Sequence, residues 1–248
     1  MSRPLLVLVH GMEDGPGCWQ PLVEQLGDRW WTIAPALPWR AGGDYRWRAT
    51  GTPGALLAAE LATVLSTVDE RPVALVGHSF GANAVLELAA RASAPAAALV
   101  LLSPTYRPPD LELTWATFDR SRAAFDRQIA DGVATRLGRR LATLDADVAA
   151  AMAAKAADRA GPAGFLAAYD QFAASADLPL RAVPMPALVL SGRGDPSLGR
   201  TRAAALAAAM PTARVVVEDH FDHFCHVRQA ADVAARITEF LDTTGSHR

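Results

Sequence analysis

The stretch LVGHSFGAN, residues 75–83, places one serine between two glycines directly after an apolar run. The apolar run is typical of a buried strand, and the residues after Gly81 favour a helix. Such a sharp turn brings the strand and helix backbones close together, which favours glycine at positions 77 and 81. The hydroxyl of Ser79 is then held outward, beside the free N–H groups of the new helix. The stretch predicts a reactive serine, with a structural serine in a tight turn as the alternative.

Short apolar runs bounded by turn residues recur along the chain. They are PLLVLVHG (4–11), WWTIAPALP (30–38), PVALVGHS (72–79), AAALVLLSP (96–104), PALVLSGRGD (186–195) and ARVVVEDH (213–220). Their cores are continuous rather than alternating, as in strands buried on both faces of a parallel sheet. Helix-length segments separate them, at residues 16–27, 54–68, 80–92, 198–209 and 227–242. Because strand and helix alternate, the sequence predicts an α/β fold with a mostly parallel, doubly wound sheet.

The interval from residue 105 to residue 185 is longer than one crossover needs. Its apolar residues recur mostly at four-residue steps, which predicts amphipathic helices interrupted near Gly132 and Gly138. These apolar residues are Phe118, Phe125, Ile129, Val133, Leu137, Leu141, Val148 and Met152. We therefore expect residues 1–104 and 186–248 to form the core, and residues 105–185 to form a helical cap over the carboxyl edge of the sheet.

Composition bears on the class of partner. The net charge is −2 and the charged residues are scattered, so no basic field favours nucleic acid. No run approaches the roughly 20 apolar residues of a membrane helix. Cys18 and Cys225 are the only cysteines, too few for a disulfide framework. We expect a cytoplasmic protein that acts on a small molecule, without nucleic acid or membrane partners. The sequence leaves the oligomeric state open.

A reactive serine needs a base, and the base needs an orienting acid. Asp195 follows a predicted strand, on the same sheet edge as Ser79; the alternative is a turn aspartate before Pro196. The loop after the last strand offers His220, His223 and His226. His223 lies a few residues before the closing helix and is the preferred base, with His220 in reserve. Loop histidines without a clear set of cysteines or carboxylates are weak support for zinc, so we expect no metal and no cofactor.

The loop after the first strand reads His10-Gly11-Met12. A tetrahedral intermediate of acyl transfer needs two convergent N–H donors. We expect the backbone N–H groups of Met12 and Phe80 to form this oxyanion hole. His10 is expected to be a hydrogen-bonded structural histidine rather than a second base.

Taken together, these motifs resemble the α/β-hydrolase superfamily, in its small, cap-bearing esterase and lactonase-like branch. The resemblance runs from Pro4 to Leu241 and rests on VLVHG, VGHSFGA, PALVLSGRGD and HFDHFCHVRQAADVAARITEFL. It implies that His223 takes the catalytic position. It also implies a sheet of about six strands, because the chain begins at VLVHG and the two strands that usually open this fold are missing.

The loop after the second strand departs from the family pattern, which often has an aspartate and a GxG turn there. Here it reads APALPWRAGGDYRWR, residues 34–48. Its aromatic and basic residues either touch the substrate or belong to a surface loop with tryptophans tucked beneath it. The arginines of the expected cap likewise have two interpretations. They either bind a carboxylate substrate or form the solvated face of the cap helices. These arginines are Arg120, Arg122, Arg127, Arg136, Arg139 and Arg140.

The resemblance implies a cofactor-free serine hydrolase that cleaves an ester, lactone or thioester through an acyl-enzyme, with Ser79, Asp195 and His223 as its triad. The same site could serve acyl transfer, carbon-carbon bond hydrolysis, or elimination and cyclisation in specialised metabolism. A ligand receptor that retains the triad is a further alternative. Serine at position 79 argues against the epoxide-opening and halide-displacing members, which use aspartate there.

Overall fold

The computed structural model describes residues 3–68, 73–91 and 94–245, in which six parallel strands form one sheet. The strands are β1 (Leu5–Val9), β2 (Trp31–Ile33), β3 (Ala74–His78), β4 (Ala98–Leu102), β5 (Ala187–Gly192) and β6 (Ala213–Glu218). Their order is β2-β1-β3-β4-β5-β6, and each neighbouring pair is parallel. The predicted doubly wound α/β sheet is therefore confirmed.

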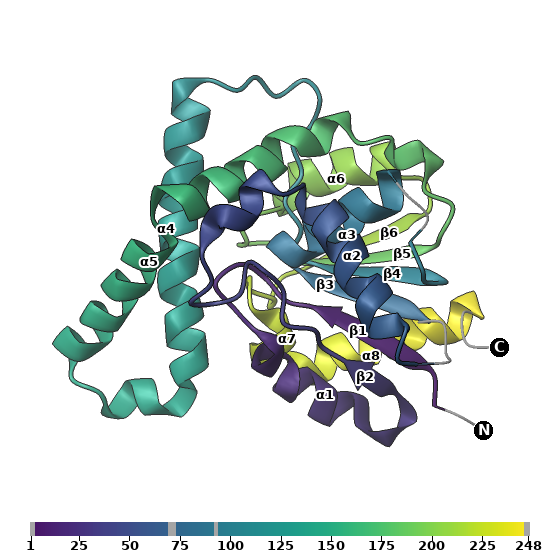
Figure 1. Cartoon of the computed structure of the whole chain (residues 1–248), viewed down its shortest axis with the longest axis horizontal. Helices are drawn as coiled ribbons and strands as arrows, with labels where there is room; N and C mark the ends of the chain where they lie inside the picture. Colours follow the sequence, from purple (N-terminus) through teal and green to yellow (C-terminus); the bar gives the residue numbers. More distant parts are fainter. Residues whose placement is uncertain (1–2, 69–72, 92–93, 246–248) are drawn as a thin grey trace.

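Helices cover both faces of this sheet (Figure 1). One face carries α1 (Gln20–Leu26) and α8 (Ala230–Thr244), and the other carries α2 (Pro53–Leu65), α3 (Phe80–Arg91) and α6 (Gly199–Ala209). The short helix α7 (Cys225–Arg228) precedes α8. The 3-10 helices are η1 (Pro16–Trp19), η2 (Gly27–Arg29), η3 (Tyr45–Ala49), η4 (Gly138–Thr143), η5 (Ser175–Asp177) and η6 (Leu180–Ala182). The predicted helix over 227–242 is thus divided at Gln229, and residue 92 of another predicted helix lies outside the described residues.

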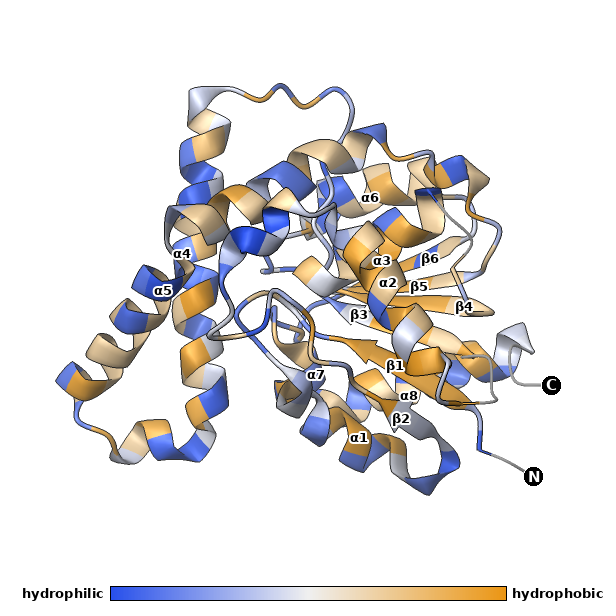
Figure 2. Cartoon of the chain, in the orientation of Figure 1, coloured by the Kyte–Doolittle hydropathy of each residue, from blue (hydrophilic) through white to orange (hydrophobic). Residues whose placement is uncertain are grey.

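Strand β1 shows why its residues are continuously apolar. Leu5, Val7 and Val9 pack with the side chains of α2 and α3, whereas Leu6 and Leu8 pack with those of α1 and α8. All of these side chains are buried. The sheet therefore has an apolar cluster on each face, and its central strands stand out as hydrophobic in Figure 2.

The chain reverses its direction of travel across the sheet next to β1. It passes from β1 to β2 on one side and then returns to β3 on the other side. The loops after β1 and β3 consequently diverge toward opposite faces, and the carboxyl ends of these strands border a crevice in which α/β proteins commonly bind ligands. Val9 pairs with Gly77 in the register, so the two loops start side by side.

The chain between β4 and β5 carries α4 (Trp115–Leu137) and α5 (Ala146–Ala174), which form a helical hairpin beside the sheet (Figure 1). α5 bends at Gly161, where φ is 53°, directly before Pro162. The predicted interruption near Gly132 is wrong because α4 continues through it. A Cβ at Gly132 would lie 3.1 Å from the ring of Phe224, so close packing accounts for this glycine. The predicted interruption at Gly138 coincides with the end of α4.

The α4–α5 hairpin has an apolar cluster of its own. It is formed by Phe125, Ile129, Val133, Ala156, Ala160 and Phe165. The predicted apolar face is therefore packed along α4, whereas Leu141, Val148 and Met152 at the far end are exposed. The boundary between a core and a cap remains a prediction. In the described part of the chain, no helix combines the length and the apolar character needed to cross a membrane.

Candidate active site

Ser79 stands at the junction of β3 and α3 with a φ of 51°, a conformation uncommon for a residue other than glycine. A Cβ at Gly77 would lie 2.6 Å from the Cα of Ala82, and one at Gly81 would collide with the carbonyl oxygens that end β1. Both glycines are therefore required by the close approach of the backbones. The strand, turn and helix predicted from the sequence are all present, and Ser79 is half-buried.

Three of the predicted site residues come together at the carboxyl edge of the sheet. Nε2 of His223 lies 3.0 Å from Oγ of Ser79, and Nδ1 of His223 lies 3.1 and 3.2 Å from the carboxylate oxygens of Asp195. His223 and Asp195 are both buried. With the proton on Nδ1, the imidazole donates to Asp195 and can accept the Ser79 proton at Nε2.

The surroundings of Asp195 favour its ionised form. Burial alone would raise the pKa of this carboxyl, but the charge of His223 and the hydrogen bond from His223 oppose that effect. The backbone N–H of Ser197 also donates to Asp195, over 2.9 Å. Together these interactions hold the pKa of Asp195 below its usual value. Asp195 can therefore keep His223 in the tautomer that carries its proton on Nδ1.

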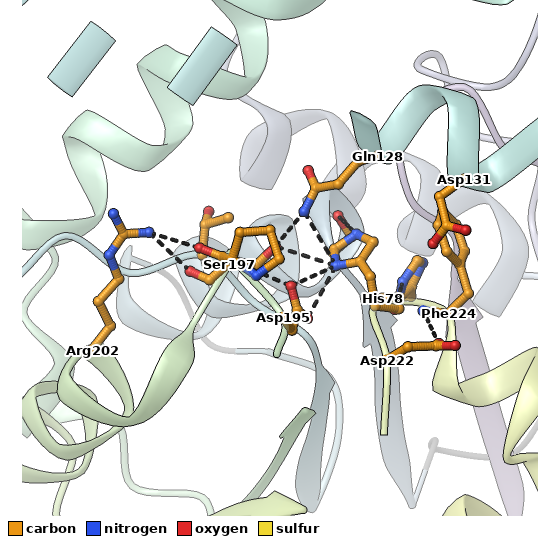
Figure 3. A network of polar contacts seen from close by, with 12 residues as sticks. His78, Gln128, Asp131, Asp195, Ser197, Arg202, Asp222 and Phe224 are labelled. Carbon is orange, nitrogen blue, oxygen red and sulfur yellow. Dashed lines mark hydrogen bonds and ion pairs between the residues drawn. The ribbon is translucent and has the colours of Figure 1, made fainter. Parts of the chain in front are cut away.

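Ser197 and Gln128, which no sequence motif indicates, lie next to Asp195 and His223. Oγ of Ser197 lies 3.2 Å from Nδ1 of His223, and the amide of Gln128 donates to Ser197 over 2.6 Å. Figure 3 shows Gln128, Ser197 and Asp195 converging, with Gln128 reaching in from α4. A single glutamine in an amphipathic pattern carries no signal of this role, since only the docking of α4 brings it here.

His78, the residue before Ser79, links the turn to the histidine loop. It is buried, and its Nε2–H donates to the backbone carbonyl of His223 over 2.8 Å. Burial, followed by the charges of His226 and His223, holds the pKa of His78 well below its usual value. A neutral His78 therefore holds the backbone of the histidine loop through this hydrogen bond and is not free to act as the base.

The other two histidines of the loop lie elsewhere. His220 is exposed on the surface, with Nε2 2.9 Å from a carboxylate oxygen of Asp232. His226 is fully buried between the rings of Trp19 and His78, with centroid distances of 4.8 and 4.1 Å. Of the three, His223 is the histidine whose ring nitrogen meets Ser79.

Met12 and Phe80 border a cavity of about 70 Å³ together with Ser79 and His223. Within the described ranges, no protein acceptor takes the backbone N–H of Met12 or of Phe80. Phe80 is the first residue of α3, where N–H groups lack an intrahelical partner. Both N–H groups are therefore available to a ligand, and their role as an oxyanion hole stays a prediction.

His10 is buried and hydrogen-bonded on both ring nitrogens. Nδ1 lies 2.8 Å from the carbonyl oxygen of Gly11, and Nε2 accepts the N–H of Leu37 over 3.1 Å. Burial lowers its pKa to about 4. This environment matches the predicted structural role of His10.

The tryptophans and the arginines of the loop after β2 lie in different surroundings. Trp39 and Trp47 are buried beneath it, with ring centroids 5.3 and 5.9 Å from that of Phe80. Arg40 is exposed, and Arg48 pairs with Asp170 of α5 over 2.8 Å. Both tryptophans thus pack beneath the loop and against Phe80 of the site, as the surface-loop interpretation expects.

One group of side chains could hold a metal ion. Asp14, Cys18 and His226 each place one candidate ligand atom within 4.8 Å of the others. In the part of the chain that the structure describes, both ring nitrogens of His226 lack a hydrogen-bond partner. Among the residues that the structure describes, no fourth such ligand joins this group. A thiophilic divalent cation there would have an open coordination position. These three residues share no local motif, because Asp14 and Cys18 lie near one end of the chain and His226 near the other.

The buried histidines make the fold sensitive to acid. Burial lowers the pKa of His10 to about 4 and that of His226 to about 3, and keeps that of His78 well below its usual value. Unfolded histidine titrates near pH 6.5, so below that pH the unfolded chain binds more protons than the folded one. The stability contributed by these neutral histidines is fully present above about pH 6.5. We expect the free energy of unfolding, measured with urea, to fall by about 4 kcal/mol for each pH unit of acidification near pH 5.

A pair of variants isolates this effect. In His226→Phe one titrating ring is removed without loss of a hydrogen bond, so about one third of this slope should disappear. His220→Phe removes an exposed ring from the same loop and serves as the comparison variant. An unchanged slope in His226→Phe would show that this histidine does not oppose protonation.

Glu13 ties the Met12 loop to α5. Its buried carboxylate accepts hydrogen bonds from Nε of Arg159 over 2.7 Å and from the hydroxyl of Tyr45 over 2.9 Å. Arg159→Met leaves this carboxylate buried without its counter-charge. We expect the free energy of unfolding to fall by about 3 kcal/mol, the lower end for a buried pair, since Arg159 is itself partly exposed. Urea denaturation measures the change.

Arg122 supplies the matched control, because its ion pair with Asp126 lies on the surface of α4. Arg122→Met should cost no more than about 0.5 kcal/mol. Equal losses in the Arg159 and Arg122 variants would contradict a special role for the buried pair.

Comparisons with known proteins agree with this fold. The sequence profile of the alpha/beta hydrolase family matches residues 6–236. The lipase LipV of Mycobacterium tuberculosis (strain ATCC 25618 / H37Rv) is 38% identical over 105 residues, which are 42% of this chain and 38% of the lipase. The match therefore spans well under half of that relative.

Similar folds also occur among solved structures. A bacterial membrane phospholipase A, described as a virulence factor, superposes with a TM-score of 0.70 at 19% identity, over 97% of this chain and 79% of its own. An E-2-(acetamidomethylene)succinate hydrolase superposes with a TM-score of 0.69 at 22% identity, over 97% of this chain and 92% of its own. At these identities the likeness shows the fold alone.

Proposed function

The chain belongs to the alpha/beta hydrolase family, and we propose that it is a serine hydrolase that cleaves an ester, lactone or thioester bond of a small organic substrate. The observation that carries this proposal is the continuous contact from Ser79 through His223 to Asp195, at 3.0 and 3.1 Å. A serine hydroxyl is a weak nucleophile at its ordinary pKa, and an adjacent oriented base activates it.

The reaction begins when Nε2 of His223 takes the proton of Ser79 as Oγ attacks the substrate carbonyl. Asp195 keeps the proton of His223 on Nδ1 and stabilises the imidazolium that forms. The imidazolium then returns its proton to the leaving group, which leaves an acyl group on Ser79. In the second half, His223 activates water to release the acid and restore the serine.

The N–H groups of Met12 and Phe80 hold the oxyanion of each tetrahedral intermediate in this proposal. Their freedom from protein acceptors and their position around the cavity support the assignment. Such a donor contributes about 3 kcal/mol of transition-state stabilisation. The contact of Glu13 with Arg159 holds the loop that carries Met12, so the hairpin also supports the oxyanion hole.

The α4–α5 hairpin serves as the cap in this proposal. Phe125, Gln128 and Ile129 of α4 line the cavity that contains Ser79, together with Ala168 of α5. These side chains exclude water from the reacting carbonyl and limit the size of the acyl group. A water-poor site strengthens the electrostatic interactions among the catalytic groups.

Whether an oxygen atom of water enters the acid product distinguishes hydrolysis from the other reactions that the same triad could catalyse. We expect turnover of an activated ester in H₂¹⁸O to place one labelled oxygen in the acid product, as mass spectrometry detects. An acid product without label, or transfer of the acyl group to an added alcohol or amine in preference to water, would identify a transferase or lyase instead.

A further inference from the structure

The cavity around Ser79 adjoins a second compartment of about 80 Å³. The two share Thr105, Phe125, Gln128 and Ala168 as lining residues, so they lie side by side beneath α4 and α5. Four of the twelve residues that line the second compartment are aromatic. They are Phe125, Phe165, Tyr169 and Phe172. This compartment suits an apolar chain of a few carbon atoms.

One charged side chain interrupts these walls. Arg202 is the one charged residue among the lining residues of the second compartment. It comes from the first turns of α6, and its guanidinium carbon lies 5.0 Å above the ring of Phe172. Figure 3 shows Arg202 on the opposite side of Ser197 from Asp195. The guanidinium therefore belongs to the wall of the second compartment, separated from Asp195 by Ser197.

The hydrogen bonds of Arg202 use only part of its donor capacity. Nη1 donates to the backbone carbonyls of Pro196 and Ser197 over 3.1 and 3.3 Å. Within the described ranges, neither Nε nor Nη2 finds a protein acceptor, and no carboxylate lies at ion-pair distance. A guanidinium carries five N–H donors in a planar fork that matches a carboxylate. Three of them remain for a ligand.

No anionic side chain among the described residues pairs with the charge of this half-buried guanidinium. Burial, followed by repulsion from Arg120, lowers the pKa of Arg202. Arg120 donates to Thr117 over 3.3 Å and likewise has no ion-pair partner among the described side chains. By contrast, Arg122 pairs with Asp126 on the surface of α4. A partly desolvated cation beside a second cation is stabilised by an anion that enters the compartment.

We propose that Arg202 is the centre of an anion subsite that binds a carboxylate at the far end of the substrate. The inference rests on the proposed function and narrows its substrate class to esters, lactones or thioesters that carry an anionic group. The aromatic walls hold the carbon chain between the reacting carbonyl and the carboxylate. Nε and Nη2 of Arg202 bind the two carboxylate oxygens, and Nη1 keeps its bonds to the loop.

A purely structural role for Arg202, as a support for the loop at Pro196, is the competing interpretation. That role needs only Nη1 and predicts the same effect of a substitution on every substrate. An anion subsite predicts an effect that depends on the charge of the substrate. The test therefore compares substrates that differ in charge alone.

Two matched pairs of esters provide this comparison. In the first pair, the 4-nitrophenyl monoester of adipic acid carries a terminal carboxylate on its acyl chain, and the methyl ester of the same compound does not. In the second pair, the butyrate ester of 4-hydroxybenzoate carries the carboxylate on the leaving group, and that of methyl 4-hydroxybenzoate does not. We expect the anionic member of at least one pair to have a kcat/KM roughly 10- to 100-fold higher, as for a charge-assisted hydrogen bond.

Arg202→Gln should reduce this ratio to near one. Arg200→Gln is the matched control, since Arg200 lies on the same helix but is exposed and close to Asp219. It should retain both the ratio and the rate. No preference for an anion in either pair, or a preference that survives in Arg202→Gln, would overturn the subsite. A uniform loss on charged and neutral esters would show that Arg202 only supports the loop.

A binding measurement separates this inference from the proposed chemistry. Isothermal titration of adipate and of neutral adipamide into the Ser79→Ala protein needs no turnover. We expect adipate to bind, adipamide to bind at least 10-fold more weakly, and the difference to vanish when Arg202→Gln is added. Equal binding of the two would overturn the subsite even in an active hydrolase. Binding of adipate through Arg202 without any ester hydrolysis would support the subsite and count against the hydrolase alone.

Discussion

Ser79→Ala should lower kcat/KM for an activated ester by a factor on the order of 10⁴ to 10⁶, the range found when a catalytic nucleophile is removed. The hydroxyl is the protein group that forms the covalent bond to the substrate carbon in the proposed reaction. Its loss leaves the oxyanion donors and the cavity in place, so substrate binding should change little. The fold should also remain, because the backbone N–H of residue 79, not its side chain, donates to Leu102 over 2.8 Å.

Ser191→Ala supplies the control for this variant. Ser191 is a buried serine on β5 whose hydroxyl has no hydrogen-bond partner among the described residues. Its substitution should leave kcat/KM within about twofold, since Ser191 does not line the cavity that contains Ser79. Activity is measured by release of 4-nitrophenolate and folding by circular dichroism. A Ser79→Ala protein that keeps more than a tenth of the activity would rule out Ser79 as the nucleophile.

His223→Gln should cause a loss of similar size, on the order of 10⁴ to 10⁶ in kcat/KM. Glutamine has no imidazole nitrogen to accept the proton of Ser79 and pass it to the leaving group. The backbone carbonyl of residue 223 still accepts from His78, so the loop should keep its place. His220→Gln provides the matched control in the same loop, because His220 is exposed and contacts Asp232.

The two variants together decide which histidine is the base. We expect His220→Gln to retain kcat/KM within about twofold while His223→Gln is inactive. The opposite pattern, with activity lost only in the His220 variant, would assign the base to the reserve residue and would mean that the loop rearranges around the substrate. Steady-state kinetics at several pH values, with thermal melting as the check on folding, distinguishes these outcomes.

The parts of the fold that the sequence predicts are those governed by local pattern. Continuous apolar runs such as Leu5–Val9 predict strands buried on both faces. The sheet contains all six strands, but only the four central ones are fully buried, and the edge strands β2 and β6 are partly exposed. The glycines around Ser79 predict a sharp turn because no larger side chain fits there. Asp195 and His223 follow strand ends, and parallel strands bring such ends to one edge of the sheet.

The features that the sequence does not predict depend on how distant segments dock. The four-residue spacing of the insertion predicts helices but not their bend at Gly161, and it places an interruption at Gly132 where packing against Phe224 is the reason for glycine. Gln128 and Ser197 have no motif, and their contact arises only when α4 lies over the end of β5. The sequence does not distinguish Arg202 from a surface arginine. Only the structure shows that no carboxylate among the described residues lies at ion-pair distance from it.

The most direct measurement of the central claim is covalent labelling with a fluorophosphonate, which reacts with a serine only when a neighbouring base activates it. We predict that one adduct forms, that peptide mass spectrometry places it on Ser79, and that labelling disappears in Ser79→Ala and is strongly slowed in His223→Gln. An adduct on a different residue, or labelling that persists in Ser79→Ala, would contradict the claim that His223 activates Ser79.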